Sequence, residues 1–130
     1  MKTSSAKAKG RRLQQKIEHA ISRILGIPCG KDCLIQSREM GQSGCDIKLL
    51  GGVEKLYPFS IECKNTEKWN LGKAIEQAKV NAEKQKLDWQ IFLSKNNFDP
   101  VVVMDADVWF KLYLELHLRR QNRPVIQRKK

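Results

Sequence analysis

The chain lacks any long apolar run. Among its 130 residues, no stretch has the length and apolarity that predict a helix crossing a membrane, so we expect no membrane partner. The first ten residues also lack the apolar segment of a secretory signal peptide. We therefore expect a cytoplasmic protein, bacterial or made in a phage-infected cell. In that compartment its four cysteines should be reduced thiols.

Histidine and acidic residues are also scarce. The two histidines, His19 and His117, stand alone on different predicted helices, and nothing resembles a Ser-His-Asp or Cys-His triad. There are 25 Lys and Arg against 14 Asp and Glu, which gives a net charge of +11. Such an excess predicts a polyanionic partner, most simply nucleic acid.

The remaining composition is that of one folded domain. A hydrophobic fraction of 41% is typical of globular proteins, and the length suits a single core. We find no internal repeat and no linker between domains. We expect a basic flexible arm at 1–9, one domain at 10–120 and a basic flexible tail at 121–130, with both ends gripping phosphates.

Hydrophobic periodicity predicts three main helices. They span 10–25, 70–87 and a final segment from Asp105 or Asp107 to Arg120. In the final helix we expect one apolar stripe to be core: Trp109, Leu112, Tyr113 and Leu116. A second set is predicted either to complete burial within the monomer or to form a dimer contact: Phe110, Leu114 and Leu118.

Four strands and one short candidate strand accompany these helices. Strands are predicted at 45–50, 57–64, 89–94 and 101–104, with a further short one near 33–37. Helices interspersed with strands predict an α/β fold, in which helices pack against a sheet.

The most informative pattern is an acid followed by Glu-x-Lys. Asp46 lies sixteen positions before Glu62, and Lys64 follows two residues later. Side chains alternate along a strand, so Glu62 and Lys64 share a face. Two carboxylates beside an ammonium group form a hard-oxygen site for Mg²⁺ or Mn²⁺, which can support phosphodiester cleavage. The alternative is a surface strand with solvated ion pairs.

Two helical residues are further candidates for this site. Glu18, on the flank of the first apolar stripe, is a possible third acid, and an ordinary solvated glutamate is the equally good alternative. Gln77 lies beside the small-residue stripe of the second helix. Our candidates for DNA contacts are Lys9, Arg11, Arg12, Arg38, Gln42, Ser43, Lys48, Asn65, Lys68 and Lys73.

These residues, in this order along the chain, resemble the PD-(D/E)XK nuclease superfamily over roughly residues 10–115. Asp46, Glu62 and Lys64 match its motif, with Cys45 in place of the usual proline. The resemblance implies a restriction-endonuclease-like core, a central mixed sheet flanked by helices in the order α-β-β-β-α-β-β-α. The small size and the stretches 9–15 and 61–68 look most like Holliday-junction resolvases and short phage-encoded nucleases of that type.

The resemblance also implies a mechanism. Asp46, Glu62 and the backbone carbonyl of Cys63, with Glu18 as a candidate further ligand, would hold Mg²⁺, for which Mn²⁺ could substitute. Lys64 would orient or deprotonate water or neutralise phosphate charge, and Gln77 would position water or a phosphate oxygen. The product would be a nick with a 5′-phosphate. Resolving a four-way junction takes two nicks, for which we expect a homodimer.

Three other interpretations stay open on the sequence. A flap, branched-DNA or general nuclease of the same superfamily would carry the same motif. A non-catalytic nucleic-acid-binding module would explain the charge equally well. A zinc protein would use Cys29 and Cys33 with Cys45 and Cys63, although only the first two have the usual spacing.

Overall fold

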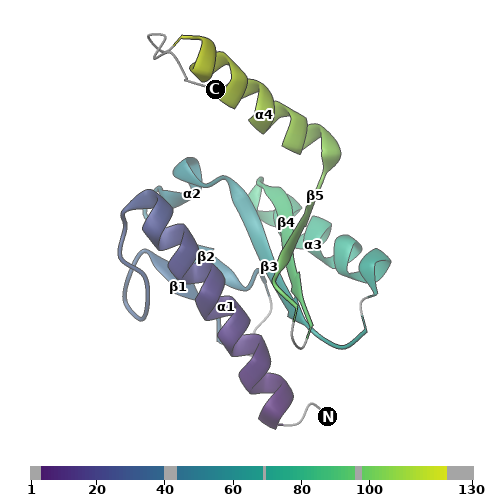
Figure 1. Cartoon of the computed structure of the whole chain (residues 1–130). Coiled ribbons are helices and arrows are strands. Elements are labelled where there is room, and N and C mark those ends of the chain that lie inside the picture. Colours follow the sequence, from purple (N-terminus) through teal and green to yellow (C-terminus); the bar gives the residue numbers. More distant parts are fainter. Residues whose placement is uncertain (1–3, 40–43, 69, 96–97, 123–130) are drawn as a thin grey trace, which may run out of the picture.

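The protein is an α/β structure with a five-stranded mixed sheet flanked by helices (Figure 1). The structure, a computed structural model, describes residues 4–39, 44–68, 70–95 and 98–122. The elements follow one another as α1 (Ser4–Leu25), β1 (Ile35–Ser37), β2 (Ile47–Leu49), α2 (Val53–Leu56), β3 (Phe59–Asn65), α3 (Leu71–Gln85), β4 (Asp88–Ser94), β5 (Val101–Met104) and α4 (Ala106–Gln121). Among these residues, none of the helices combines the length and apolarity needed to span a bilayer.

The sheet has its strands in sequence order, with β3 in the middle. The pairs β1–β2, β2–β3 and β4–β5 are antiparallel, and β3–β4 is parallel. A parallel pair needs a crossover connection, which α3 provides. The two strands are paired along their whole length, from Phe59 opposite Asp88 to Asn65 opposite Ser94.

Two apolar clusters fill the space between the sheet and its helices. α1 covers one face and contributes Leu13, Ile17 and Ile21, which contact Ile47 and Ile61 among others. α3 covers the other face, where Ala78 packs on Ile91 and Leu93. Alternate residues of β3 therefore face opposite layers. Each layer contains a fully buried isoleucine, Ile61 beneath α1 and Ile91 beneath α3.

Several predicted boundaries are corrected. Residues 4–9, expected in a flexible arm, extend α1, because Ser-Ala-Lys-Ala-Lys contains strong helix formers. Gly51 and Gly52 precede a short helix, α2, that the sequence analysis did not predict. Of the flexible tail proposed at 121–130, Gln121 is the last residue of α4, and 123–130 lie outside the described residues.

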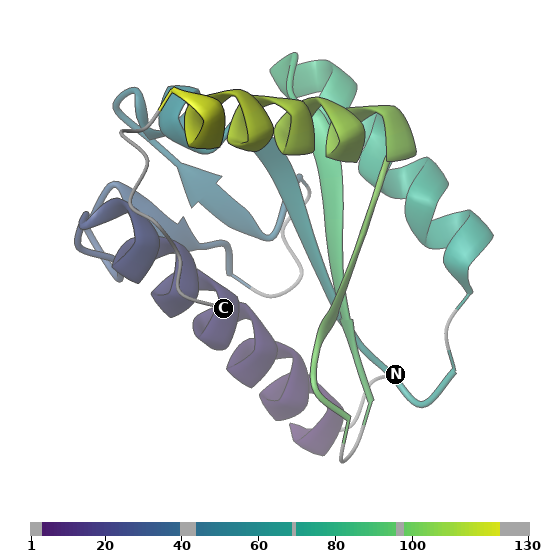
Figure 2. The ribbon, with the colours of Figure 1, turned by 45° about the horizontal axis from the view of Figure 1, so that its top comes forward.

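The prediction that the stripe of α4 is core is wrong. Asp105 caps the helix by accepting hydrogen bonds from the N–H groups of Asp107 (2.9 Å) and Val108 (3.4 Å). No residue of α4 is buried, and its large apolar side chains are exposed. The helix leaves the end of β5 and extends beyond the rest of the molecule, as two views show (Figures 1 and 2).

The central strand should dominate stability. Ile61 of β3 is fully buried in the cluster beneath α1. Ile61→Ala should therefore lower the free energy of unfolding by about 2–5 kcal/mol, because apolar burial is lost and a cavity remains. Val80→Ala, on the exposed side of α3, is the control and should change it by less than about 0.5 kcal/mol. Urea denaturation of both variants measures this, and equal values would contradict the packing described here.

Candidate active site

Glu62 and Lys64 share the face of β3 that lies under α3. Ile61, just before Glu62, joins the cluster beneath α1 instead, and Cys63, between Glu62 and Lys64, packs against the same cluster, as strand alternation requires. Glu62 is only 3% exposed, whereas Lys64 is half-buried at the edge of a cavity. A buried glutamate in the central strand is costly unless its oxygens have partners.

Asp46 lies where β2 separates from β3. The two strands pair at Ile47 and Ile61, and next to this pair the Asp46 N–H donates to the Ile61 carbonyl (2.8 Å). Beyond that point the Asp46 side chain continues the pairing, with Oδ2 accepting from the Cys63 N–H (2.7 Å). The N–H and C=O of one strand residue point to the same edge, so the Cys63 carbonyl faces this carboxylate as well.

The carboxyl groups of Asp46 and Glu62 are hydrogen-bonded to each other, and burial raises the pKa of both. Burial raises the pKa of Glu62 to about 7, helped by the charge of Asp46, although Asn81 and Lys64 act in the opposite direction. Burial also raises the pKa of Asp46, against the lowering effects of the Cys63 N–H, Glu62, Lys64 and Arg38. Near neutral pH the pair therefore tends to share a proton, because two adjacent charges repel each other.

Asn81 is the functional residue that the sequence analysis missed. Its Nδ2 donates to Oε1 of Glu62 at 2.6 Å, and the amide is 9% exposed. The predicted residue, Gln77, is exposed one turn earlier on α3 and lines a cavity with Lys64. A signal was present: Asn81 interrupts the small-residue stripe next to Ala82, and a polar residue on a buried helix face needs a partner.

Glu18 does not join the carboxylate pair. It is buried, and its Oε2 accepts a hydrogen bond from Ser37 Oγ in β1 at 2.6 Å. The described part of the chain holds no group of three or more His, Cys, Asp or Glu side chains placed to bind a metal. The structure therefore brings together Asp46, Glu62, Cys63 and Lys64, and leaves Glu18 against β1.

The pair has the donor chemistry for Mg²⁺. This ion commonly takes one or two carboxylates and keeps several waters, so two acids and the Cys63 carbonyl are sufficient. Burial first, and the charge of Asp46 second, raise the pKa of Glu62, and a bound dication would favour the charged form of both acids. Zinc fits less well. Burial, with the charges of Asp46 and Glu62, raises the pKa of the Cys63 thiol well above its ordinary value, which opposes thiolate formation.

Two basic cavities lie near the pair. The first is about 220 Å³ and is lined by Lys64, Thr66, Lys68, Asn70, Leu71, Lys73, Ala74, Gln77 and Leu93. The second is about 790 Å³ and is lined by Arg11, Gln14, Gln15, Glu18, Gly30, Lys31, Gln36, Ser37, Arg38, Glu39 and Lys48. Lys64 and Arg38, one from each cavity, both lower the pKa of Asp46, so the pair lies between them.

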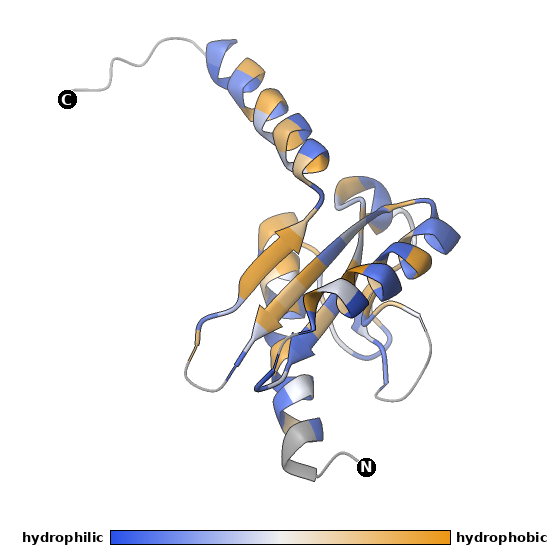
Figure 3. Ribbon diagram, turned by 90° about the vertical axis from the view of Figure 1, so that its right-hand side faces the viewer, coloured by the Kyte–Doolittle hydropathy of each residue, from blue (hydrophilic) through white to orange (hydrophobic). Residues whose placement is uncertain are grey.

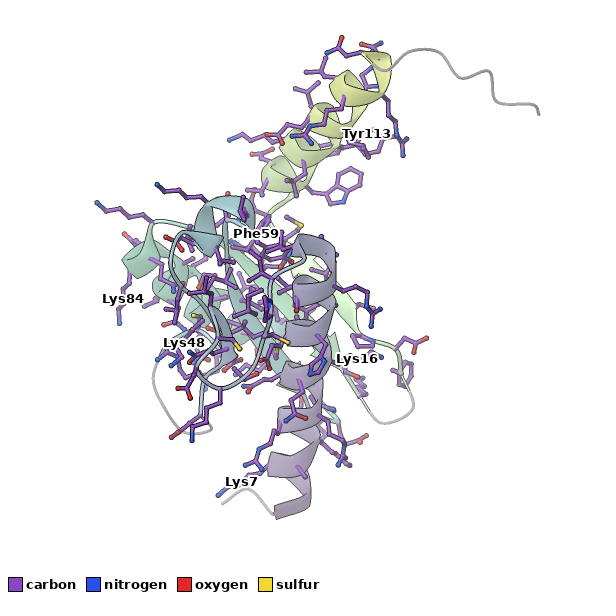
Figure 4. All side chains as sticks on the ribbon, turned by 90° about the vertical axis from the view of Figure 1, so that its left-hand side faces the viewer. Lys7, Lys16, Lys48, Phe59, Lys84 and Tyr113 are labelled. Atoms are coloured by element: carbon purple, nitrogen blue, oxygen red, sulfur yellow. The ribbon has the colours of Figure 1, made fainter. Side chains whose placement is uncertain are left out.

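Most of the predicted DNA contacts can be located relative to these cavities. Lys68 and Lys73 line the first, and Arg11, Arg38 and Lys48 line the second. Asn65 donates to the Lys9 carbonyl (3.3 Å), which ties the end of β3 to α1. Arg12 is exposed on α1, and Gln42 and Ser43 lie outside the described residues. Lys7, Lys48 and Lys84 are seen at the surface in Figure 4.

The shared proton should make stability depend on pH. Between 4.5, the ordinary pKa of glutamate, and about 7, the folded protein binds more protons than the unfolded chain. Without metal, stability linked to Glu62 is therefore present below pH 4.5 and is lost as the pH rises to 7. Glu62→Gln, which keeps the acceptor for Asn81, should gain roughly 3 kcal/mol over wild type at pH 8 and little at pH 4.5. Urea denaturation at both values measures this, and a constant difference would contradict it.

The hydrogen bond from Asn81 should matter structurally. Asn81→Ala leaves Oε1 of Glu62 without its donor in a buried setting, which should cost about 1–3 kcal/mol. Gln77→Ala is the matched control on the same helix and should be nearly neutral, since that side chain is exposed. Thermal denaturation of both variants distinguishes the residues. If the two were equally stable, Asn81 would have no such role.

Comparison of the chain with family models, with curated proteins and with solved structures finds no match.

Proposed function

We propose that this protein is a metal-dependent DNA endonuclease of the PD-(D/E)XK type. The observation that carries the proposal is the buried, proton-sharing pair of Asp46 and Glu62 beside Lys64, between two basic cavities. A structural ion pair would match each acid with a base. Here two acids lie against each other, which costs free energy unless a bound cation compensates their charge in the working protein. The mixed sheet, with α1 and α3 on opposite faces, supports a restriction-endonuclease-like core.

The residues would divide the work as follows. A bound Mg²⁺, for which Mn²⁺ could substitute, would supply Lewis acidity at the scissile phosphate and lower the pKa of water. The Cys63 N–H fixes Asp46, and Asn81 fixes Glu62, so both carboxylates are held before any ion arrives. Lys64 would neutralise charge developing on the phosphate or orient the attacking water. The product would be a nick with a 5′-phosphate.

The substrate we favour is branched DNA, most simply a four-way junction. Basic residues on either side of one carboxylate pair can grip DNA segments that diverge from the cut site. Such contacts read the backbone and its shape rather than sequence. Two symmetric nicks resolve a junction, which calls for a homodimer. A flap nuclease of the same type would share the chemistry and differ in substrate.

Cleavage assays test the proposal directly. Wild-type protein with Mg²⁺ should nick a labelled four-way junction in pairs and spare linear duplex and single strands. Glu62→Gln and Lys64→Ala should each slow cleavage by at least about 100-fold, because each removes a group that acts on the reacting phosphate. Both should bind the junction within roughly twofold of wild type, since binding is distributed over many cations.

Lys84→Ala supplies the matched control, because this exposed lysine of α3, labelled in Figure 4, lines neither cavity. It should cleave as wild type does. If only flaps were cut, the nuclease proposal would stand, and the proposed substrate would change from a four-way junction to a flap. If neither wild type nor any variant cuts DNA with Mg²⁺ or Mn²⁺, while all bind it, the protein is a non-catalytic binding module.

A further inference from the structure

The smaller of the two basic cavities has a volume that suits one aromatic ring. It encloses about 220 Å³ between the end of β3 and the start of α3. In another protein, an apolar cavity of about 150 Å³ is large enough to bind benzene. A pyrimidine ring has the size of benzene. The cavity therefore has room for a single nucleobase and too little room for a base pair.

The walls of this cavity combine apolar and polar groups. Leu93 of β4 is 2% exposed and lies opposite Lys64 in the parallel pairing of β3 with β4. Ala74 of α3 packs against the same apolar cluster as Leu93. Viewed from the side that α3 covers, the apolar strands of the sheet lie behind a helix of mixed polarity (Figure 3). A base between the two would contact apolar surface with its ring, and Gln77 offers an amide, both donor and acceptor, to its polar edge.

The cavity also has an excess of positive charge. Lys64 of β3, Lys68 of the following loop and Lys73 of α3 line it, and none of its nine lining residues is acidic. Lys68 and Lys73 are exposed, so their ammonium groups can reach phosphates outside the cavity, while Leu93 is buried. This distribution matches a nucleotide, whose base is largely apolar on its faces and whose phosphates lie on the backbone.

Lys64 connects the cavity to the carboxylate pair. Its charge lowers the pKa of both Asp46 and Glu62, so its ammonium group lies near both acids. The same side chain lines the cavity. A nucleotide with its base in the cavity would therefore place its backbone beside the two acids.

We propose that this cavity takes one unpaired base of the DNA beside the scissile phosphate. The inference rests on the proposed function and adds the feature by which the substrate is chosen. In linear duplex the base would have to leave its pair and its stack, which costs free energy. At a branch point or flap the stack is already interrupted, so the same base is extruded at lower cost. The cavity thus supplies a physical reason for sparing linear duplex.

Binding to DNA with and without the base tests the inference. Two duplexes carry the same one-nucleotide bulge, one with thymine and the other with an abasic sugar. E62Q, which should not cut, allows the affinity to be measured by fluorescence anisotropy. It should bind the thymine bulge roughly tenfold more tightly than the abasic bulge, the size expected when one base gains contacts. Equal affinities would mean that the cavity grips backbone alone, and would overturn the inference.

Variants of the cavity test its location. Added to E62Q, A74L places a larger side chain in the cavity and should remove the preference for thymine. Q77A removes the amide of an exposed side chain, which leaves the apolar cluster intact, and should reduce the preference roughly threefold. V80L adds bulk at an exposed position of the same helix and should keep the full preference. A preference that survives both A74L and Q77A would overturn the inference.

The outcome is separable from that of the proposed function. A preference for the base, combined with a wild type that cuts no DNA, would keep the cavity as a binding site and remove the nuclease. Cleavage by wild type without any preference for the base would do the reverse.

Discussion

The contact between Asp46 and Glu62 is the constraint on which the site depends. It puts two acids at the point where β2 leaves β3, with one of them almost fully buried in the central strand. The fold tolerates this arrangement because each carboxylate has a fixed donor, the Cys63 N–H or the Asn81 amide. The cost of the arrangement remains, since burial and then the charge of Asp46 raise the pKa of Glu62 to about 7. Residual strain of this kind is common where a protein binds a cation or does chemistry.

The rest of the domain holds that contact in place. Apolar residues of β3 anchor one side of the strand beneath α1, so the alternate residues must face α3. The parallel pairing with β4 fixes the position of Glu62 along the strand, opposite Ile91, and α3 places Asn81 within hydrogen-bonding distance of it. Because β1 and β2 are only three residues long, the sheet is narrow beside the site, and charged side chains can approach it from both cavities.

α4 takes little part in the hydrophobic packing of the domain from which it extends. The core clusters are complete without it, apart from Val108 at its first turn. Its other apolar residues therefore contribute little to the packing of the described domain.

The sequence by itself determined the local features. Alternation along the strand expected at 57–64 predicted that Glu62 and Lys64 share a face. The spacing of apolar residues predicted α1, α3 and α4, and Asp105 was one of two residues, with Asp107, at which the last helix was expected to begin. These depend on contacts within a few residues, which composition and periodicity encode directly.

Only the tertiary structure decided which side chains meet across elements. It gave Glu62 the buried amide of Asn81 rather than the exposed Gln77, and it set Glu18 against Ser37. It also left the apolar stripe of α4 exposed, although the same periodicity marks buried helices. The physical reason is that periodicity reports which face of a helix is apolar, while the distance between two faces depends on how all the elements pack.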